Sequence, residues 1–144
     1  MLIGEYKHIL DGKKRVAIPT RFRKELGKKV VITHGLDQCL WVYTMKEWGR
    51  VAEKLANLSF GQADTRGFNR FMLSGAIEVD IDSLGRVLVP DFLKEYAHLG
   101  ERVVLAGVHS RVEIWDEDRW TLYKRNISEQ ADALAEKLGE IGVI

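Results

Sequence analysis

Basic side chains are concentrated in one short segment of the sequence. Between Asp11 and Lys29 there are eight lysine or arginine residues and two acidic residues, although the net charge of the whole chain is only +1. A lysine ammonium group can neutralise a phosphate, and the planar guanidinium of arginine can make two hydrogen bonds to a guanine edge. Such a local excess is typical of a surface that faces a polyanion. A solvated charged surface is the alternative that charge alone leaves open.

The basic segment belongs to a repeat. The segment Asp11–Pro19, with the pattern Asp-x-x-x-Arg-Val-x-Ile-Pro, reappears about 71 residues later as Asp82–Pro90 with one conservative change, and Gly35–Trp48 matches Gly107–Trp120. A match of this length is a repeated supersecondary unit, and two copies indicate that neither buries its apolar face alone. The second copy lacks the basic excess, because Asp82–Arg102 contains three basic and four acidic residues.

The repeat places a lysine pair and Arg15 at the tip of a strand–turn–strand hairpin. In the second copy, Asp82 and Gly85 suit the first and fourth positions of a turn, because aspartate accepts backbone hydrogen bonds and glycine tolerates a positive φ. The first copy has glycine at the second position and Lys14 at the fourth. We therefore predict a different turn type there, with positive φ at Gly12.

Each copy is predicted to run strand, tight turn, strand, short helix, strand, strand and helix. Asp91 and Asp116 are predicted N-caps, and Thr44 opens a capping box. A helix over Asp64–Gly75 should link the copies, and Glu129–Gly139 should form a separate amphipathic tail helix.

These elements predict an α+β, β-rich fold in which two tandem βαβ-type repeats intertwine into one pseudo-twofold, barrel-like core with flanking helices. The repeats should cover residues 5–47 and 76–119. A helical connection is expected over residues 48–75, and C-terminal helices over residues 120–144. A chain of 144 residues suits one domain, or two small units fused into one core.

The composition, with 46% apolar and 30% charged residues, is ordinary for a soluble globular protein. No stretch approaches the roughly 20 apolar residues of a membrane span, and the first residues lack the basic-then-apolar pattern of an export signal. The single cysteine, Cys39, cannot form an internal disulfide. We expect a cytoplasmic protein without a membrane partner.

Asp-x-x-x-Arg in a hairpin, followed by an apolar strand that ends at proline, resembles the AbrB-type swapped-hairpin DNA-binding domain. Two such copies in one chain are similar to the MraZ family of bacterial regulators. The supporting segments are Gly4–Tyr6, Ile18–Arg23, Gly35–Leu40 and Phe71–Gly75. The resemblance covers nearly the whole chain, except about the last fifteen residues. In the first copy, Lys14 replaces the family's usual glycine.

The resemblance implies a regulator that represses its own promoter in the division and cell-wall gene cluster. It implies recognition of short direct repeats in double-stranded DNA by the first-copy hairpins of several subunits, which form a homo-oligomer with the shape of a closed ring. It also implies a location at the nucleoid. No cofactor is expected.

Under this resemblance, Arg15 is the best candidate for reading bases. The contacts to the DNA backbone are assigned to five basic residues, Lys13, Lys14, Arg21, Arg23 and Lys24. Asp11 and Gly12 are expected to fix the turn and the Arg15 rotamer, and an Asp11–Arg15 ion pair is the structural alternative. In the second copy, Asp82 and Arg86 are expected to form a structural pair rather than to contact DNA.

An enzyme is the first rival interpretation, and the sequence does not favour it. The four histidines (His8, His34, His98 and His109) are scattered without metal-ligand spacing, and no phosphate loop or nucleophile motif appears. A magnesium site at Asp80 and Asp82 is a minor alternative, and no metal site is expected. The second rival is an antitoxin-type AbrB-like module whose C-terminal helix binds a partner protein.

Overall fold

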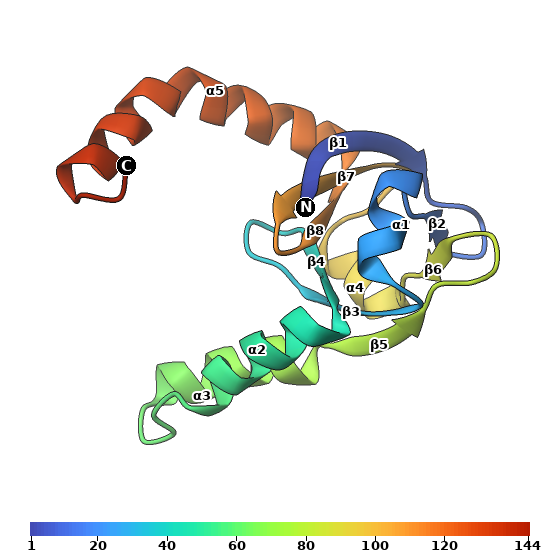
Figure 1. The fold of residues 1–144 in the computed structure, drawn as a ribbon, viewed down its shortest axis with the longest axis horizontal. Helices are drawn as coiled ribbons and strands as arrows, with labels where there is room; N and C mark the ends of the chain where they lie inside the picture. The colour runs from blue at the N-terminus through green and yellow to red at the C-terminus, as the bar shows by residue number, and fades with distance from the viewer.

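Strands and short helices follow one another in the same order in both copies (Figure 1). The structure, a computed structural model, describes residues 1–144. The first copy contains β1 (Leu2–Ile9), β2 (Arg15–Ala17), α1 (Thr20–Leu26), β3 (Lys29–His34), β4 (Leu40–Thr44) and α2 (Met45–Ala56). The second contains β5 (Ile77–Asp80), β6 (Arg86–Leu88), α4 (Asp91–Tyr96), β7 (Arg102–His109), β8 (Val112–Asp116) and α5 (Glu117–Glu140). The predicted order of elements is confirmed in both copies.

The larger sheet has six antiparallel strands in the order β1-β7-β8-β4-β3-β5. If the two copies are exchanged, so that β1 replaces β5, β3 replaces β7 and β4 replaces β8, the same order is obtained in reverse. The sheet therefore mixes strands of both copies with pseudo-twofold symmetry. It does not close into a barrel, and the barrel-like part of the prediction is wrong. The physical reason is that β2 and β6 pair with each other in a separate two-stranded sheet. Only the isolated bridge between Leu10 and Val16 connects this pair to the end of β1, so no continuous ladder joins the edge strands β1 and β5.

One hydrophobic core contains residues of both copies. Its 19 buried residues form a single cluster that includes Val16 and Phe22 of the first copy and Val87 and Leu93 of the second. A polar contact also crosses between the copies, because the hydroxyl of Tyr96 in α4 donates to the carbonyl of Gly35 at 2.6 Å. Neither copy encloses a core of its own.

The helix starts confirm some predictions and correct others. Thr44 and Asp116 cap α2 and α5, because each side chain accepts a hydrogen bond from the backbone N–H three residues later, at 3.0 and 3.3 Å. Asp91 is not the cap of α4, since Pro90 occupies that position and Asp91 is the first helical residue. Proline has a fixed φ and no N–H, so it is tolerated just where a helix begins.

The linking and C-terminal helices also differ from the prediction. The link is divided into α3 (Ala63–Asn69) and the π-helical turn η1 (Arg70–Ser74), and Asp64 is not its N-cap because Gln62 precedes the helix. The C-terminal region is one continuous helix, α5, rather than two. Residues 117–138 contain neither glycine nor proline, so no residue interrupts the helix there.

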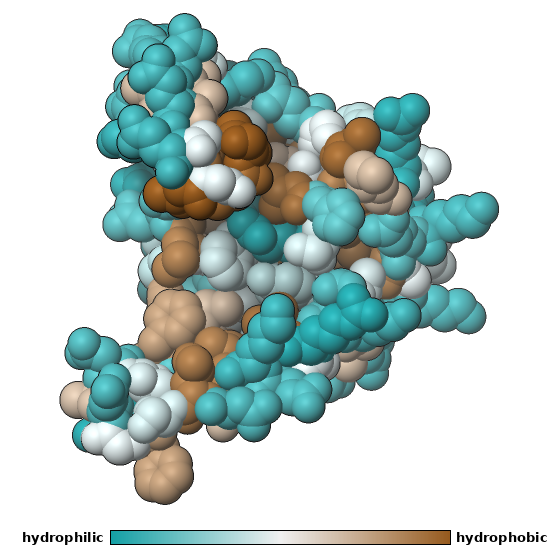
Figure 2. Space-filling model, turned by 60° about the vertical axis from the view of Figure 1, so that its left-hand side comes forward, coloured by the Kyte–Doolittle hydropathy of each residue, from teal (hydrophilic) through white to brown (hydrophobic).

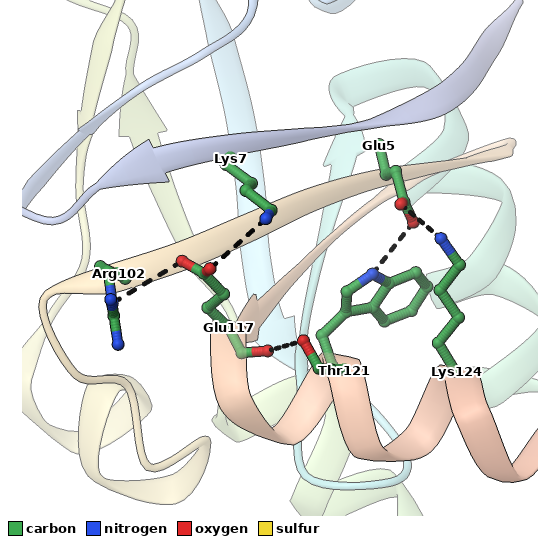
Figure 3. A network of polar contacts seen from close by, with 7 residues as sticks. Glu5, Lys7, Arg102, Glu117, Thr121 and Lys124 are labelled. Carbon is green, nitrogen blue, oxygen red and sulfur yellow. Dashed lines mark hydrogen bonds and ion pairs between the residues drawn. The ribbon is translucent and has the colours of Figure 1, made fainter.

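Two helical arms project from one side of the molecule, away from the β2–β6 pair (Figure 1). α2, α3 and the residues that join them form the α2–α3 arm, and α5 with the residues that follow it forms the α5 arm. Ion pairs hold the base of α5 to the sheet (Figure 3): Lys124 contacts Glu5 at 2.6 Å, and Glu117 contacts Lys7 at 3.6 Å and Arg102 at 3.8 Å. Beyond Lys124 the helix makes no side-chain hydrogen bond or ion pair with the rest of the chain.

Apolar side chains gather on the face between the two arms (Figure 2). The α2–α3 arm exposes Leu58 and Phe60, the latter 85% exposed, and the α5 arm exposes Ile127, Leu138 and Ile141. None of the helices is both long enough and apolar enough to span a membrane.

Candidate nucleic-acid interface

Asp11 organises the first turn, residues 11–14, through backbone hydrogen bonds. Its carbonyl accepts the N–H of Lys14 at 3.0 Å. Its carboxylate oxygen Oδ1 accepts the N–H groups of Lys13 and Arg15, at 2.8 and 2.9 Å. One aspartate thus fixes the backbone of the whole basic tip.

Asp82 organises the second turn, residues 82–85, in the same way. Its carbonyl accepts the N–H of Gly85 at 2.9 Å, and its Oδ1 accepts the N–H groups of Leu84 and Arg86, both at 2.9 Å. The predicted change of turn type is therefore wrong. The positive φ falls on Lys14, at 61°, just as it falls on Gly85, at 76°, and Gly12 does not take this conformation.

Both carboxyl groups favour the charged form. The backbone N–H of Arg15 is the main cause that holds the pKa of Asp11 below its ordinary value, and the backbone N–H of Arg86 acts in the same way on Asp82. A hydrogen bond donated to a carboxylate stabilises its ionised form. The two turns are therefore built around ionised aspartates.

The side chains of the two arginines differ in their partners. The Nε of Arg86 donates to Oδ2 of Asp82 at 2.9 Å. The guanidinium of Arg15 has no ion pair and donates no hydrogen bond within the chain. The alternative of an Asp11–Arg15 ion pair is thus absent from this structure, and a role of Asp11 in fixing the Arg15 rotamer stays a prediction.

The β2–β6 ribbon carries both arginines on one face. Val16 lies opposite Val87, and both are buried in the core. Because side chains alternate across a strand, Arg15 and Arg86 lie on the outer face of the ribbon. The sequence prediction missed this placement, since the pairing of β2 with β6 joins residues that are far apart in the chain.

Each turn packs beside a helix of the other copy. The carbonyl of Lys14 accepts the N–H of Val89 at 2.8 Å, at the start of α4, and the carbonyl of Gly85 accepts the N–H of Ile18 at 2.8 Å, at the start of α1. The second turn thus lies next to α1, where a Cβ on Gly85 would come within 2.2 Å of the Cζ of Arg23.

Because each turn packs beside the helix of the other copy, basic residues that are neighbours in sequence lie apart in the structure. Lys13 lies exposed on the first turn, whereas Arg21 and Lys24 lie exposed on α1, the helix beside the second turn. Arg23 is half-buried, and its Nε donates to the carbonyl of Ile18 at 2.7 Å. Lys14, on the first turn, pairs with Asp91 of α4. These basic residues therefore lie beside both turns of the ribbon instead of forming one cluster around the first tip.

The structure brings together no group of three or more histidine, cysteine, aspartate or glutamate side chains that could hold a metal ion. Asp80 is the partner of Asp82 in the alternative magnesium site. Its carboxylate forms an ion pair with the ammonium group of Lys29, at 3.8 Å from Nζ.

The same division into two copies appears in a comparison with known families. The family described as "MraZ protein, putative antitoxin-like" matches residues 1–71 and, a second time, residues 72–139. The chain belongs to the MraZ family. Each MraZ match contains one Asp-x-x-x-Arg turn, one ribbon strand and one short helix that flanks the other copy's turn.

Relatives named Transcriptional regulator MraZ align with 143 residues, which is 99% of this chain and 100% of each relative. The MraZ of Moorella thermoacetica is 51% identical, that of Caldicellulosiruptor saccharolyticus 46%, and that of Acetivibrio thermocellus 44%. The similarity to MraZ thus includes the ribbon, the sheet and both arms. None of these names denotes an enzyme.

Proposed function

We propose that this protein is a sequence-specific DNA-binding transcriptional regulator. The observation that carries the proposal is the free guanidinium of Arg15, which has no partner in its own chain and follows the exposed Lys13 on the ribbon edge. An uncommitted arginine can make two parallel hydrogen bonds to guanine in the major groove. Contacts to phosphates are assigned to the basic residues of the first turn and of α1, Lys13, Lys14, Arg21, Arg23 and Lys24.

The family relationship supports a more detailed form of this proposal. The protein represses its own promoter, in the division and cell-wall gene cluster, by binding short direct repeats in double-stranded DNA. Its site of action is the nucleoid in the cytoplasm. The relatives that cover the whole chain carry the name of a transcriptional regulator.

The two copies are proposed to be AbrB-like units with different roles. Residues 5–47 face the DNA, and residues 76–119 complete the core and contribute to assembly. Residues 48–75 connect them, and residues 120–144 form the C-terminal arm. The Asp82–Arg86 ion pair supports a structural role for the second turn, since it commits the arginine to a partner in its own chain.

Several subunits are proposed to form a closed homo-oligomeric ring. A heterologous contact that closes limits assembly, whereas one that fails to close produces filaments. The apolar residues between the arms lie away from the ribbon (Figures 1 and 2), so contacts through the arms leave the basic turns accessible.

DNA selectivity is the decisive test. Fluorescence anisotropy compares a duplex from the protein's own promoter, carrying the direct repeats, with a scrambled duplex of equal length and base composition. At physiological salt we expect the promoter duplex to bind at least about a thousandfold more tightly. Equal affinity for both duplexes would contradict the proposal.

A protein-interaction module of the antitoxin type is the second candidate, and the distal part of α5 favours it because its side chains are almost all exposed. Truncation after Lys124 separates the two functions. Promoter selectivity that survives truncation supports the DNA-binding proposal, whereas a full-length protein without DNA selectivity would leave the interaction module as the better proposal.

A further inference from the structure

One acidic side chain lies against the basic first turn. The Nζ of Lys14 and the carboxylate of Asp91 form an ion pair, and the hydrogen bond from the Val89 N–H to the Lys14 carbonyl, at 2.8 Å, holds the turn next to the start of α4. The repeat puts Gly85 and Thr20 at the equivalent positions, and neither residue has a charge. The charged pair therefore occurs at the first turn and has no counterpart at the second, although the backbone hydrogen bonds of the two turns match.

Folding stability does not account for this pair. Lys14 adopts a φ of 61°, a conformation that favours glycine, and the other copy has glycine there. The two side chains are 39% and 65% exposed, and an exposed ion pair contributes little to stability. The pair has a larger consequence for the charge that the first turn presents, because Asp91 neutralises one of its two cations, Lys13 and Lys14.

We propose that Asp91 holds the Lys14 ammonium away from DNA phosphates and thereby lowers the affinity of the first turn for DNA of any sequence. This inference rests on the DNA binding proposed above. A phosphate and the Asp91 carboxylate compete for the same ammonium group. Binding to random DNA then proceeds with one phosphate contact fewer, while the base contact of Arg15 is unaffected. Asp91 thus weakens the sequence-independent part of binding, whereas discrimination between sequences depends on Arg15.

Asp91→Asn tests the inference, with Glu95→Gln as its matched control. Glu95 is exposed on the same helix, and its substitution removes the same charge, but Glu95 forms no ion pair with Lys14. Both variants and the wild type are titrated with a random duplex over a range of salt concentrations. Thermal unfolding checks that the variants remain folded.

Asp91→Asn should bind random DNA about eightfold more tightly at about 0.1 M salt, because one additional phosphate contact steepens the dependence of log K on log salt by about 0.9. Glu95→Gln should leave this slope unchanged. In a Lys14→Gly background, Asp91→Asn should have no larger effect than Glu95→Gln.

Equal slopes for Asp91→Asn and Glu95→Gln, or an undiminished effect of Asp91→Asn in the Lys14→Gly background, would overturn the inference while leaving DNA binding intact. A wild-type protein that binds neither promoter nor random DNA would overturn the proposed function, and the role of Asp91 with it. The salt slope separates the two failures, because it is measured only on a protein that binds.

Discussion

Lys14 and Gly85 hold the same left-handed backbone conformation, with φ of 61° and 76°. Their N–H groups close equivalent turns at 3.0 and 2.9 Å, and their carbonyls each accept a hydrogen bond from the other copy at 2.8 Å. The two positions have the same backbone geometry, but one is occupied by lysine and the other by glycine. At this turn position, a residue with a Cβ therefore adopts the unfavourable conformation in the first copy and not in the second.

Lys14→Gly should make the protein more stable. Relief of the left-handed conformation contributes about 1–2 kcal/mol, and the additional chain entropy of glycine removes about 0.5–1 kcal/mol. The free energy of unfolding, measured by urea denaturation, should rise by the difference, about 0.5–1 kcal/mol. The matched substitution Gly85→Ala should destabilise by more than about 1 kcal/mol, because its Cβ would also lie 2.2 Å from the Cζ of Arg23. Effects of equal sign at the two positions would contradict this account.

The sequence predicts the elements of this protein well because they depend on local signals. The strand–turn–strand order and the caps at Thr44 and Asp116 follow from residue types within a few positions of each other, and all are present. The type of the first turn was wrong for a specific reason. Glycine at position 12 favours one turn locally, but the hydrogen bonds of Asp11 and of Val89 impose another.

The arrangement of the basic residues depends on pairing between the copies, which the sequence does not specify locally. Lys13 and Arg21 are eight positions apart in the chain, yet one lies on the first turn and the other on the helix beside the second. Arg86 lies on the same ribbon face as Arg15 because of the β2–β6 register. Asp91 is close to Lys14 for the same reason, because the first turn packs against α4 of the second copy.

The interleaved sheet predicts that neither half of the chain folds alone. Cutting the chain within residues 57–65 leaves β3 and β4 without β5 and β8, and separates Val16 from Val87. We expect each purified half to lack a cooperative thermal transition, and the mixed halves to recover one. Two halves that each unfold cooperatively in isolation would be inconsistent with a shared core.

Low pH should destabilise the folded protein through the aspartates of both turns. The folded-state pKa values of Asp11 and Asp82 lie below the ordinary value of 3.8, mainly through the backbone N–H groups of Arg15 and Arg86. A lowered pKa contributes stability that is fully present above the unfolded-state pKa and is lost as the pH falls through the folded-state value. The free energy of unfolding should therefore decrease below about pH 4. Asp11→Asn with Asp82→Asn should be less stable at pH 7 and show a shallower acid decrease. An unchanged pH profile would refute the role of these carboxylates.

Arg15→Ala should reduce sequence preference. Loss of a bidentate contact to guanine reduces discrimination by about 1–3 kcal/mol, measured as the ratio of affinities for promoter and scrambled DNA. Lys13→Ala should weaken binding to both duplexes alike and reduce the salt slope by about one. Arg86→Ala should have a smaller effect, because its guanidinium is bonded to Asp82 at 2.9 Å. Wild-type selectivity in Arg15→Ala, or a greater loss in Arg86→Ala, would reverse the assignment.

Assembly should determine affinity, because a single ribbon edge contacts few base pairs. Several ribbons held at fixed separation convert each later contact into an intramolecular event, which raises avidity by about 10²–10⁴. This requires operator repeats whose spacing matches the separation of the ribbons. The exposed apolar residues of the arms, such as Phe60 and Leu138, lie away from the ribbon and are available for contacts between subunits.

Light scattering and footprinting test this last prediction together. The wild type should be a homo-oligomer of defined mass, and occupancy should rise steeply between duplexes that carry one, two and four repeats. Inserting half a helical turn between repeats should abolish the increase, because it rotates alternate sites to the opposite side of the DNA, whereas inserting a full turn should preserve more of it. Phe60→Ser with Leu138→Ser should lower the mass and the avidity, but leave the affinity for a single repeat unchanged. A monomer in solution, or affinity that is indifferent to the number and spacing of repeats, would exclude the ring as the source of tight binding.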